Sequence, residues 1–292
     1  MKKIVTHSGA FHADDVFAMA ALQLYLGDEN LEVTRTRDEK LIKEADWVFD
    51  VGAIYDPQKQ RFDHHQPGAP IRDNGIPYAA FGLVWQQVGE EVAGSKEIAE
   101  AIDESLGMPI DANDNGTSLY ELNDFQVAPL EIQNFIAKLN PVWGTDEDYD
   151  NNFMRAVEIA REVLERFITH EQARAEMDKL VREVYEAAQD KTILVFDQPV
   201  STKLCVKYPD VRAAVTPDDP RVSYNWAAVA IRKNENSFET RFSFPPEWGG
   251  LRNEELAQVS GVEDAVFCHR SGFLFITKSK DSAVALAKKF AK

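Results

Sequence analysis

The chain has 292 residues, which is too long for one ordinary core and predicts two domains. Its 49 acidic and 32 basic side chains give a net charge of −17. Nonspecific nucleic-acid binding relies on Lys and Arg to neutralise phosphates, so this charge argues against a protein that binds long duplexes. Short phosphate esters remain open as substrates.

The sequence carries no signal for a zinc ribbon, for secretion or for a membrane. Cys205 and Cys268 are isolated and form no CxxC pair, so we interpret them as reduced thiols. The basic start of the chain could open a signal peptide, but His7, His12 and Asp14 interrupt the apolar run that would have to follow. No apolar run approaches the length of a membrane helix. We therefore expect a cytoplasmic protein.

Predicted strands and helices alternate along the first part of the chain. Strands are predicted at residues 3–6, 31–36 and 47–51, and helices at 16–26, 38–45, 79–92, 97–106 and 130–139. The helix at 16–26 is apolar almost all round, which is typical of a buried helix. This alternation predicts a parallel sheet with helices on both faces. Ligands of such sheets bind outside the carboxyl ends of the strands.

A long helical segment at 153–188, which residues 169–171 could interrupt, leads to a region of different character. There, strands are predicted at 192–196, 203–207, 211–215, 226–231, 237–242 and 273–277, and helices at 253–258 and 282–290. The prediction is therefore an α/β domain of residues 1–190 followed by a smaller α+β domain of residues 191–292.

Histidine is scarce but clustered. Four of the six histidines lie in the first quarter of the chain, in segments that also carry aspartates: His7, His12, His64 and His65. For a lone histidine, a hydrogen bond to a nearby aspartate is the ordinary interpretation. Four histidines among at least four aspartates favour a metal centre, because imidazole and carboxylate together bind first-row divalent metals well.

The candidate ligands fall at or just past the ends of predicted strands. His7 and Asp14 follow the first strand, and Asp50 ends a buried one. Asp50 is the best candidate to bridge two ions, since a rigid strand end can point one carboxylate between them. Two-metal sites hold their ions ~3.5–4 Å apart and stabilise the attacking and leaving oxygens of an in-line displacement. One of Asp14 and Asp15 could instead only cap the following helix.

Other chemistries have less support. The sequence contains no GxSxG nucleophile elbow, no Walker phosphate loop and no GxGxxG fingerprint after the first strand. Asp63, His64 and His65 supply further ligands from a loop, and either Asp111 or Asp114 supplies another. A metal-dependent hydrolase is the class that these residues favour.

The candidate ligands lie within longer motifs. In chain order these are Thr6-His7-Ser8-Gly9-Ala10-Phe11-His12-Ala13-Asp14-Asp15, Asp50-Val51-Gly52, Phe62-Asp63-His64-His65-Gln66, Asp111-Ala112-Asn113-Asp114-Asn115-Gly116, and residues 237–241, 246–252, 260–261 and 267–273. Together, in this order and over nearly the whole chain, they resemble the melanocyte-proliferating-gene family, which is similar to the DHH phosphoesterase superfamily. His12 stands where the superfamily often has the first of two aspartates.

The resemblance implies a DHH-type domain, a smaller substrate-binding domain, and two divalent ions, with manganese expected and magnesium as the alternative. The metal ligands expected are His7, His12, Asp14, Asp50, His64 and Asp114. The catalytic residues expected are Asp63, His64 and His65. The substrate contacts expected are His65, Arg241, Arg252 and His269, although a surface salt bridge would explain each arginine equally well. Which of His64 and His65 binds metal stays open.

Characterised relatives of this family include a 3′–5′ exoribonuclease. We therefore expect a two-metal-dependent phosphoesterase, and specifically a 3′–5′ exonuclease that acts on RNA or short single-stranded oligonucleotides. A hydrolase of a small phosphoanhydride or nucleotide, and a non-enzymatic metal-binding regulatory protein, are the alternatives. The expected partner is single-stranded RNA, a short oligonucleotide or a small phosphate ester, with no membrane involved and a homodimer left open.

Overall fold

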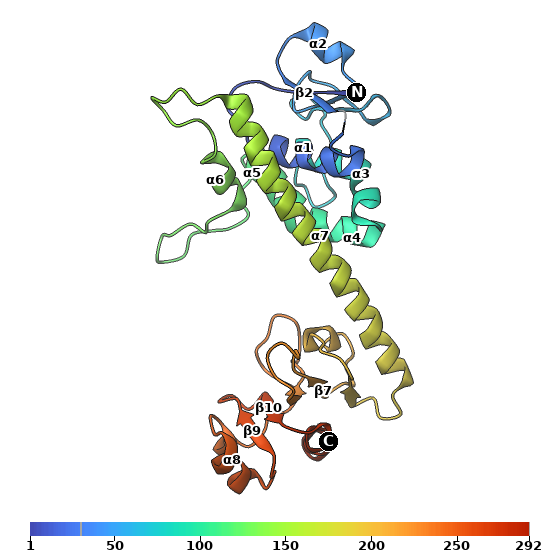
Figure 1. Ribbon diagram of the computed structural model, residues 1–292, viewed down its shortest axis with the longest axis vertical. Coiled ribbons are helices and arrows are strands. Elements are labelled where there is room, and N and C mark those ends of the chain that lie inside the picture. Colours follow the sequence, from blue (N-terminus) through green and yellow to red (C-terminus); the bar gives the residue numbers. More distant parts are fainter. Residues whose placement is uncertain (30, 292) are drawn as a thin grey trace. The chain divides into compact units, whose positions relative to one another are not determined.

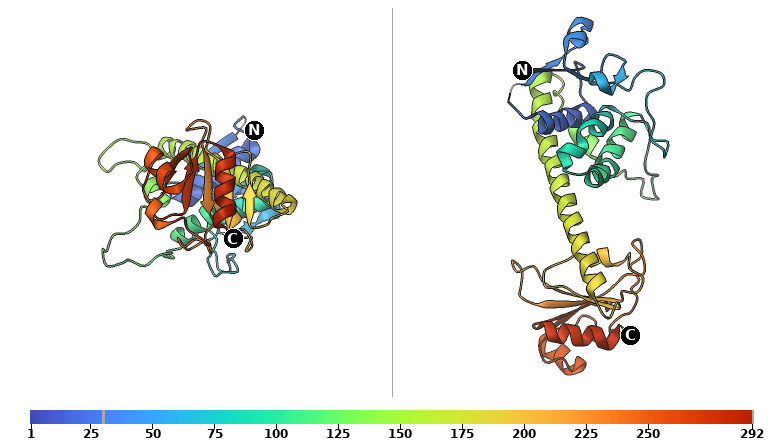
Figure 2. Two further views of the ribbon diagram at one scale, coloured as in Figure 1. Left: turned by 90° about the horizontal axis from the view of Figure 1, so that it is seen from below. Right: turned by 90° about the vertical axis from the view of Figure 1, so that its right-hand side faces the viewer.

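The computed structural model describes residues 1–29 and 31–291. The chain divides into two compact units, Met1–Ala173 (unit 1) and Arg174–Lys292 (unit 2). The division falls inside one long helix, α7 (Tyr149–Ala187), which is continuous through residues 169–171 (Figure 1, Figure 2). The predicted boundary after residue 190 lies just past the end of this helix.

Unit 1 is built on a five-stranded sheet with the order β2-β1-β3-β5-β4. Its strands are β1 (Lys2–Thr6), β2 (Leu31–Arg35), β3 (Trp47–Phe49), β4 (Tyr55–Asp56) and β5 (Arg61–Phe62). The first three were predicted, whereas β4 and β5 have two residues each, too few to show an alternating pattern. β1 pairs in parallel with β2 and β3, β3 pairs in parallel with β5, and β4 is antiparallel to β5.

Helices cover both faces of this sheet, as predicted. They are α1 (Ala13–Leu26), α2 (Glu39–Glu44), α3 (Ala80–Ala93), α4 (Lys96–Ile102), α5 (Met108–Asp114) and α6 (Ile132–Ala137), with a π-helical segment at Asp103–Gly107 between α4 and α5. Ile4 of β1 shares a core with Phe17 of α1 and Phe81 of α3. The next residue, Val5, packs with Ile42 of α2. Neighbouring side chains of a strand point to opposite faces, so these contacts place helices on both sides.

Unit 2 contains a second five-stranded sheet, with the order β6-β7-β8-β10-β9. Its strands are β6 (Ile193–Val195), β7 (Ala213–Pro217), β8 (Trp226–Ala230), β9 (Ala265–Cys268) and β10 (Leu274–Thr277). Only β6 and β7 pair in parallel, and the other neighbours are antiparallel. α9 (Lys280–Phe290) packs against one face and the last turns of α7 against the other, while α8 (Asn253–Ser260) lies beside β9. The mixed α/β class is therefore confirmed.

Two strands predicted in unit 2 are wrong. Residues 203–207 begin as a 3₁₀ helix (Thr202–Cys205), and residues 237–242 form a loop with one isolated bridge between Thr240 and Arg232. The guanidinium of Arg241 donates hydrogen bonds to the carbonyls of Val206 and Tyr208, 2.7 and 2.6 Å away. Because a side chain satisfies these carbonyl groups, the first segment needs no neighbouring strand. The missed strand β9 lies instead beside β10.

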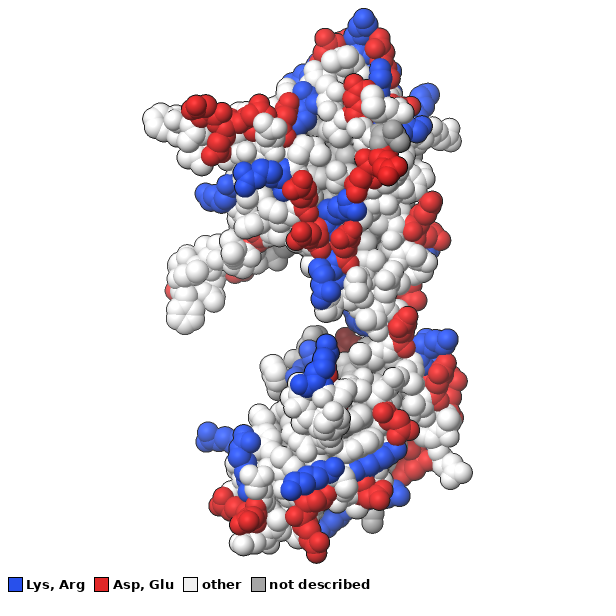
Figure 3. Space-filling view, in the orientation of Figure 1, with Lys and Arg blue, Asp and Glu red and all other residues white. Residues whose placement is uncertain are grey.

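The surface carries both signs of charge. In Figure 3, Lys and Arg side chains are dispersed among Asp and Glu on the faces turned to the viewer, rather than gathered in one large basic patch. This distribution agrees with the net charge of −17. None of the helices in the described part of the chain is both long and apolar enough to cross a membrane.

Candidate metal centre

One edge of the unit 1 sheet collects residues that are far apart in the sequence. His7 follows β1, Asp50 follows β3 and Asp63 follows β5, and these three strands run in parallel. Their carboxyl ends therefore meet at the same edge. His7 Nε2 lies 3.1 Å from Asp50 Oδ2, and both residues are 4% exposed. The predicted convergence of these segments is present in the structure.

Asp50 lies between two histidines. Its Oδ2 is 3.1 Å from His7 Nε2, and its Oδ1 is 3.2 Å from His64 Nε2. Its backbone has a φ of 56°, in the left-handed region that aspartate tolerates better than most residues. Burial alone would raise the pKa of Asp50, but the hydrogen bonds from His64 and His7 outweigh it and lower the pKa to about 2. Each carboxylate oxygen thus faces a different partner, which is the arrangement that a bridging ligand needs.

The two aspartates at the start of α1 differ in their contacts. Asp15 Oδ1 accepts a hydrogen bond from the backbone N–H of His12 at 2.9 Å, so Asp15 caps the helix. Asp14 Oδ2 accepts from the backbone N–H of Ala80 at 3.2 Å. Among the described residues, the buried Asp14 Oδ1 has no hydrogen-bond partner. Burial, together with the charges of neighbouring aspartates, raises the pKa of Asp14 well above its usual value. A cation beside this oxygen would relieve both effects.

Asp114, rather than Asp111, faces the cluster. Asp114 is the last residue of α5, and its Oδ2 lies 3.3 Å from His64 Nε2 while its Oδ1 lies 3.7 Å from His12 Nδ1. Asp111 is fully buried and pairs with Arg72 Nη2 at 2.7 Å. The geometry favours Asp114 over Asp111 as the candidate ligand.

The three residues of the DHH triplet, Asp63, His64 and His65, differ in their contacts and exposure. Asp63 Oδ1 accepts from the backbone N–H groups of His64 and His65 at 2.8 and 3.1 Å, and its Oδ2 accepts from the N–H of Ala53 at 2.5 Å. Asp63 Oδ1 also lies 2.7 Å from His65 Nδ1. The side chain of His64 is 6% exposed and that of His65 is 62% exposed. This geometry favours His64 as a ligand and leaves His65 Nε2 open to solvent.

The residues present fit divalent metal ions. Three groups have donor atoms within 4.8 Å of one another: His7, His12 and Asp50; Asp50, His64 and His65; and His12, Asp14 and Asp114. All six predicted ligands belong to these groups, and Asp50 belongs to two of them. Carboxylate oxygens with imidazole nitrogens form a donor set that suits first-row divalent metals. The buried Asp14 Oδ1 lacks a hydrogen bond within the described chain, as expected of an atom that serves an ion.

The predicted substrate contacts of unit 2 have different surroundings. Besides its bonds to Val206 and Tyr208, the Arg241 guanidinium donates to the carbonyl of Val211, which supports a structural role. Phosphate binding by Arg241 stays a prediction. Arg252 is exposed and its guanidinium lies 4.4 Å from the centre of the Phe267 ring. His269 Nδ1 lies 2.9 Å from Ser271 Oγ, with Nε2 left for other partners.

Sequence reasoning missed one basic side chain beside the cluster. Arg37 lies two residues past β2, and its Nη2 is 3.4 Å from His7 Nδ1. The rule that ligands bind at the carboxyl ends of parallel strands was applied to β1 and β3 but not to β2. Applied there as well, it would have pointed to Arg37.

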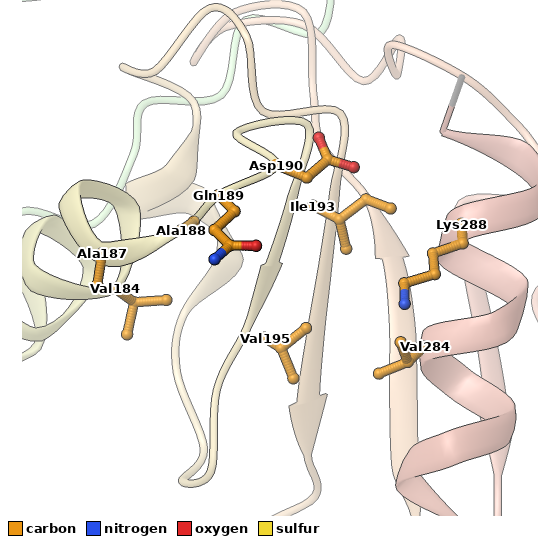
Figure 4. Close-up of a pocket in the computed structure, with 9 residues that line it drawn as sticks. All are labelled: Val184, Ala187, Ala188, Gln189, Asp190, Ile193, Val195, Val284 and Lys288. Carbon is orange, nitrogen blue, oxygen red and sulfur yellow. The ribbon is translucent and has the colours of Figure 1, made fainter.

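Two hollows lie away from this cluster. A hollow of about 360 Å³ in unit 2 is lined by the end of α7, by Ile193 and Val195 of β6, and by Val284 and Lys288 of α9 (Figure 4). Another of about 800 Å³ lies against α3 and α4 in unit 1. Neither is lined by a predicted site residue.

Comparisons with known proteins cover almost the whole chain. The "MYG1 exonuclease" of Homo sapiens is 29% identical over 98% of this chain and 85% of its own length, and that of Rattus norvegicus is 30% identical over 98% and 84%. The "MYG1 protein" of Dictyostelium discoideum is 27% identical over 98% and 95%. A solved pGpG-specific phosphodiesterase from Vibrio aligns over 99% of this chain and 97% of its own, at 14% identity and a TM-score of 0.30, which is too low to argue from. Residues 3–290 match the family MYG1_exonuc, described as an uncharacterised protein family (UPF0160), and the chain belongs to that family.

Proposed function

We propose that this protein is a two-metal-dependent phosphoesterase that acts as a 3′–5′ exonuclease on RNA or short single-stranded oligonucleotides. The observation that carries the proposal is the position of Asp50, which is shared by two groups of candidate ligands. The human and rat relatives are named exonucleases, and these names support hydrolysis of a phosphoester bond as the reaction class. Manganese is the proposed ion, with magnesium as the alternative.

Each candidate ligand has a place in this proposal. His7, His12 and Asp50 would hold one ion, and His64 and Asp114 would help to hold the other. Asp14, grouped with His12 and Asp114, would offer its unpartnered oxygen. Bound divalent ions would supply positive charge to both the attacking and the leaving oxygen. Asp63 orients the ring of His65 through Nδ1, so Nε2 is free to exchange a proton with an oxygen of the substrate.

Unit 2 supplies the proposed contacts for the rest of the substrate. Arg252 has an exposed guanidinium, and His269 has a ring held by Ser271 and flanked by Phe273 at 4.5 Å between ring centroids. A guanidinium offers a planar fork of donors that matches phosphate oxygens. We assign both residues to phosphate groups of the oligonucleotide.

The experiment that tests the proposal couples metal analysis to a substrate panel. Purified protein is assayed for bound manganese and then incubated with labelled RNA, DNA, dinucleotides and pyrophosphate, with oligonucleotides blocked at either the 3′ or the 5′ end. Removal of single nucleotides from unblocked 3′ ends is expected. Faster turnover of pyrophosphate or dinucleotides than of RNA would favour the small-substrate alternative, which the net charge of −17 also permits. Bound metal without turnover of any substrate would contradict the proposal and indicate a regulatory protein.

A further inference from the structure

Arg37 is a cation without a counterion at the edge of the candidate metal centre. Its side chain is exposed, and it lies on the loop that follows β2. Within residues 1–29 and 31–291, no carboxylate forms an ion pair with it, although the chain contains 49 acidic residues. Its one close polar neighbour is His7 Nδ1, 3.4 Å from Arg37 Nη2. The donors of this exposed guanidinium, beside a group of candidate ligands, are available to a further partner.

The contact with His7 occupies at most one donor of Arg37. His7 Nδ1 faces the backbone carbonyl of Ser8 at 3.3 Å, whereas Nε2 faces the carboxylates of Asp15 and Asp50. A carbonyl can only accept a hydrogen bond, so the tautomer with its proton on Nδ1 donates to Ser8. In the other tautomer, Nδ1 accepts one N–H of Arg37. The contact therefore uses at most one of the five N–H donors of the exposed guanidinium, and at least four are available to another ligand or to water.

A second arginine, at the end of β2, shows what a structural role looks like. Arg35, two residues earlier, is 8% exposed. Its Nη2 donates to the carbonyl of Gly9 at 2.8 Å, its Nη1 lies 3.1 Å from Asp150 Oδ1, and its guanidinium lies 4.6 Å from the centre of the Phe153 ring. Arg35 thereby fixes the loop that carries His7 and His12. Arg37 has none of these contacts, so the fold does not account for it.

We propose that Arg37 binds a phosphate oxygen of the substrate directly beside the metal centre, an inference that rests on the proposed phosphoesterase function. The ligand would be the phosphate group next to the bond that is cleaved, because Arg37 adjoins the candidate ligand His7. Two N–H groups of a guanidinium can bind two phosphate oxygens at once, which a lysine cannot do. Unit 1 would then bind the reacting phosphate through a residue of its own.

The test measures binding as well as turnover. Arg37→Gln and Arg37→Lys are compared with the matched control Arg166→Gln, which removes the same charge from an exposed position on α7. The probe is a fluorescent oligonucleotide whose 3′-terminal linkage is a phosphorothioate, with binding followed by anisotropy in the presence of manganese and bound manganese measured in parallel. We expect Kd to rise about 10-fold or more for Arg37→Gln and about threefold for Arg37→Lys, because the loss of a charge-assisted hydrogen bond has that effect. The control and the manganese content should match the wild-type protein.

Two results would overturn the inference alone. Equal affinity of Arg37→Gln and wild-type protein for the probe would show that Arg37 does not touch the substrate. Loss of manganese from either Arg37 variant would show that Arg37 acts through His7 instead. If the wild-type protein neither binds the probe nor hydrolyses any phosphoester, the proposed function itself fails, and that outcome is distinguished by the wild-type arm.

Discussion

The two units each contain a five-stranded sheet, yet the candidate chemistry gathers at only one of them. In unit 1 the strands β1, β3 and β5 are parallel, so the residues that follow them meet at one edge. In unit 2 the neighbours β7, β8, β10 and β9 are antiparallel, so successive strand ends alternate between opposite edges. A parallel sheet can therefore assemble a site from segments far apart in the sequence. Among the described residues, the largely antiparallel sheet of unit 2 assembles no such group of candidate ligands.

Two arginines, one in each unit, differ in whether the fold already occupies their hydrogen-bond donors. Arg37 follows a strand of the parallel sheet and has no ion-pair partner in the described part of the chain. Arg241 of unit 2 lies in a loop and gives its donors to the carbonyls of Val206, Tyr208 and Val211. Residue type alone therefore does not identify a phosphate contact; the position of the residue relative to strand ends, and the bonds that it already makes, decide its role.

The largest effect is expected from the carboxylate that the parallel sheet presents to both groups of ligands. Asp50→Asn should lower kcat/KM on labelled RNA by ~10³-fold, because a bridging ligand loses the charge that holds both ions. Asp46→Asn, at the opposite end of the same strand, is the control. Asp46 accepts a hydrogen bond from the N–H of Lys3 and lies outside the cluster. Full activity of the Asp50 variant, with normal folding, would refute the proposed centre.

The next largest effects should separate the two histidines of the DHH triplet. His64→Gln is expected to reduce bound manganese, since His64 Nε2 lies 3.2 Å from Asp50 and 3.3 Å from Asp114. His65→Gln should retain the metal and lower kcat by ~10²-fold, as expected for a residue that transfers a proton. Asp63→Asn should lower kcat by about 10- to 100-fold, because it no longer orients His65. Metal loss from the His65 variant, rather than from the His64 variant, would reverse this assignment.

The sequence was sufficient to predict the convergence of the candidate ligands, but not their individual roles. The alternation of strands and helices indicated a parallel sheet, and the end of a strand is a position that can be located from the chain alone. The roles of Asp14 and Asp15 could not be separated, because they depend on which carboxylate reaches the backbone N–H of His12 and which reaches that of Ala80. Likewise, the pairing of Asp63 with His65 depends on side-chain directions that no spacing encodes.

The strand predictions failed for a related reason in unit 2. The segment at 203–207 has the composition of a strand. However, the carbonyls of Val206 and Tyr208 accept hydrogen bonds from Arg241, which lies more than thirty positions later in the chain. Such a long-range bond leaves no local pattern. The residues of β4 and β5 were missed because each strand has only two residues, and their pairing follows from the positions of Tyr55 and Phe62 in the folded sheet. Tertiary contacts outweighed local propensity at these positions.

A smaller effect, on stability rather than on chemistry, is expected from Arg241. Arg241→Gln should leave three carbonyl groups without their donor and lower the stability of unit 2 by about 2 kcal/mol. Thermal denaturation followed by circular dichroism measures the change as a lower Tm. Bound manganese should be unaffected, since the candidate ligands all lie in unit 1. An unchanged Tm together with a raised KM would instead make Arg241 a phosphate contact.

The smallest effect is expected from Arg252, the exposed arginine of unit 2. Its guanidinium contacts the Phe267 ring, an interaction that contributes about 0.5–1 kcal/mol at an exposed site, so Arg252→Gln should change Tm little. If Arg252 binds a phosphate away from the reacting bond, the variant should raise KM about threefold on RNA while kcat stays constant, because such a contact is made equally in the ground state and the transition state. Arg270→Gln, another exposed arginine of the same unit, controls for the loss of charge. A fall in kcat without a change in KM would place Arg252 at the reacting phosphate, and the division of work between the two sheets would then be wrong.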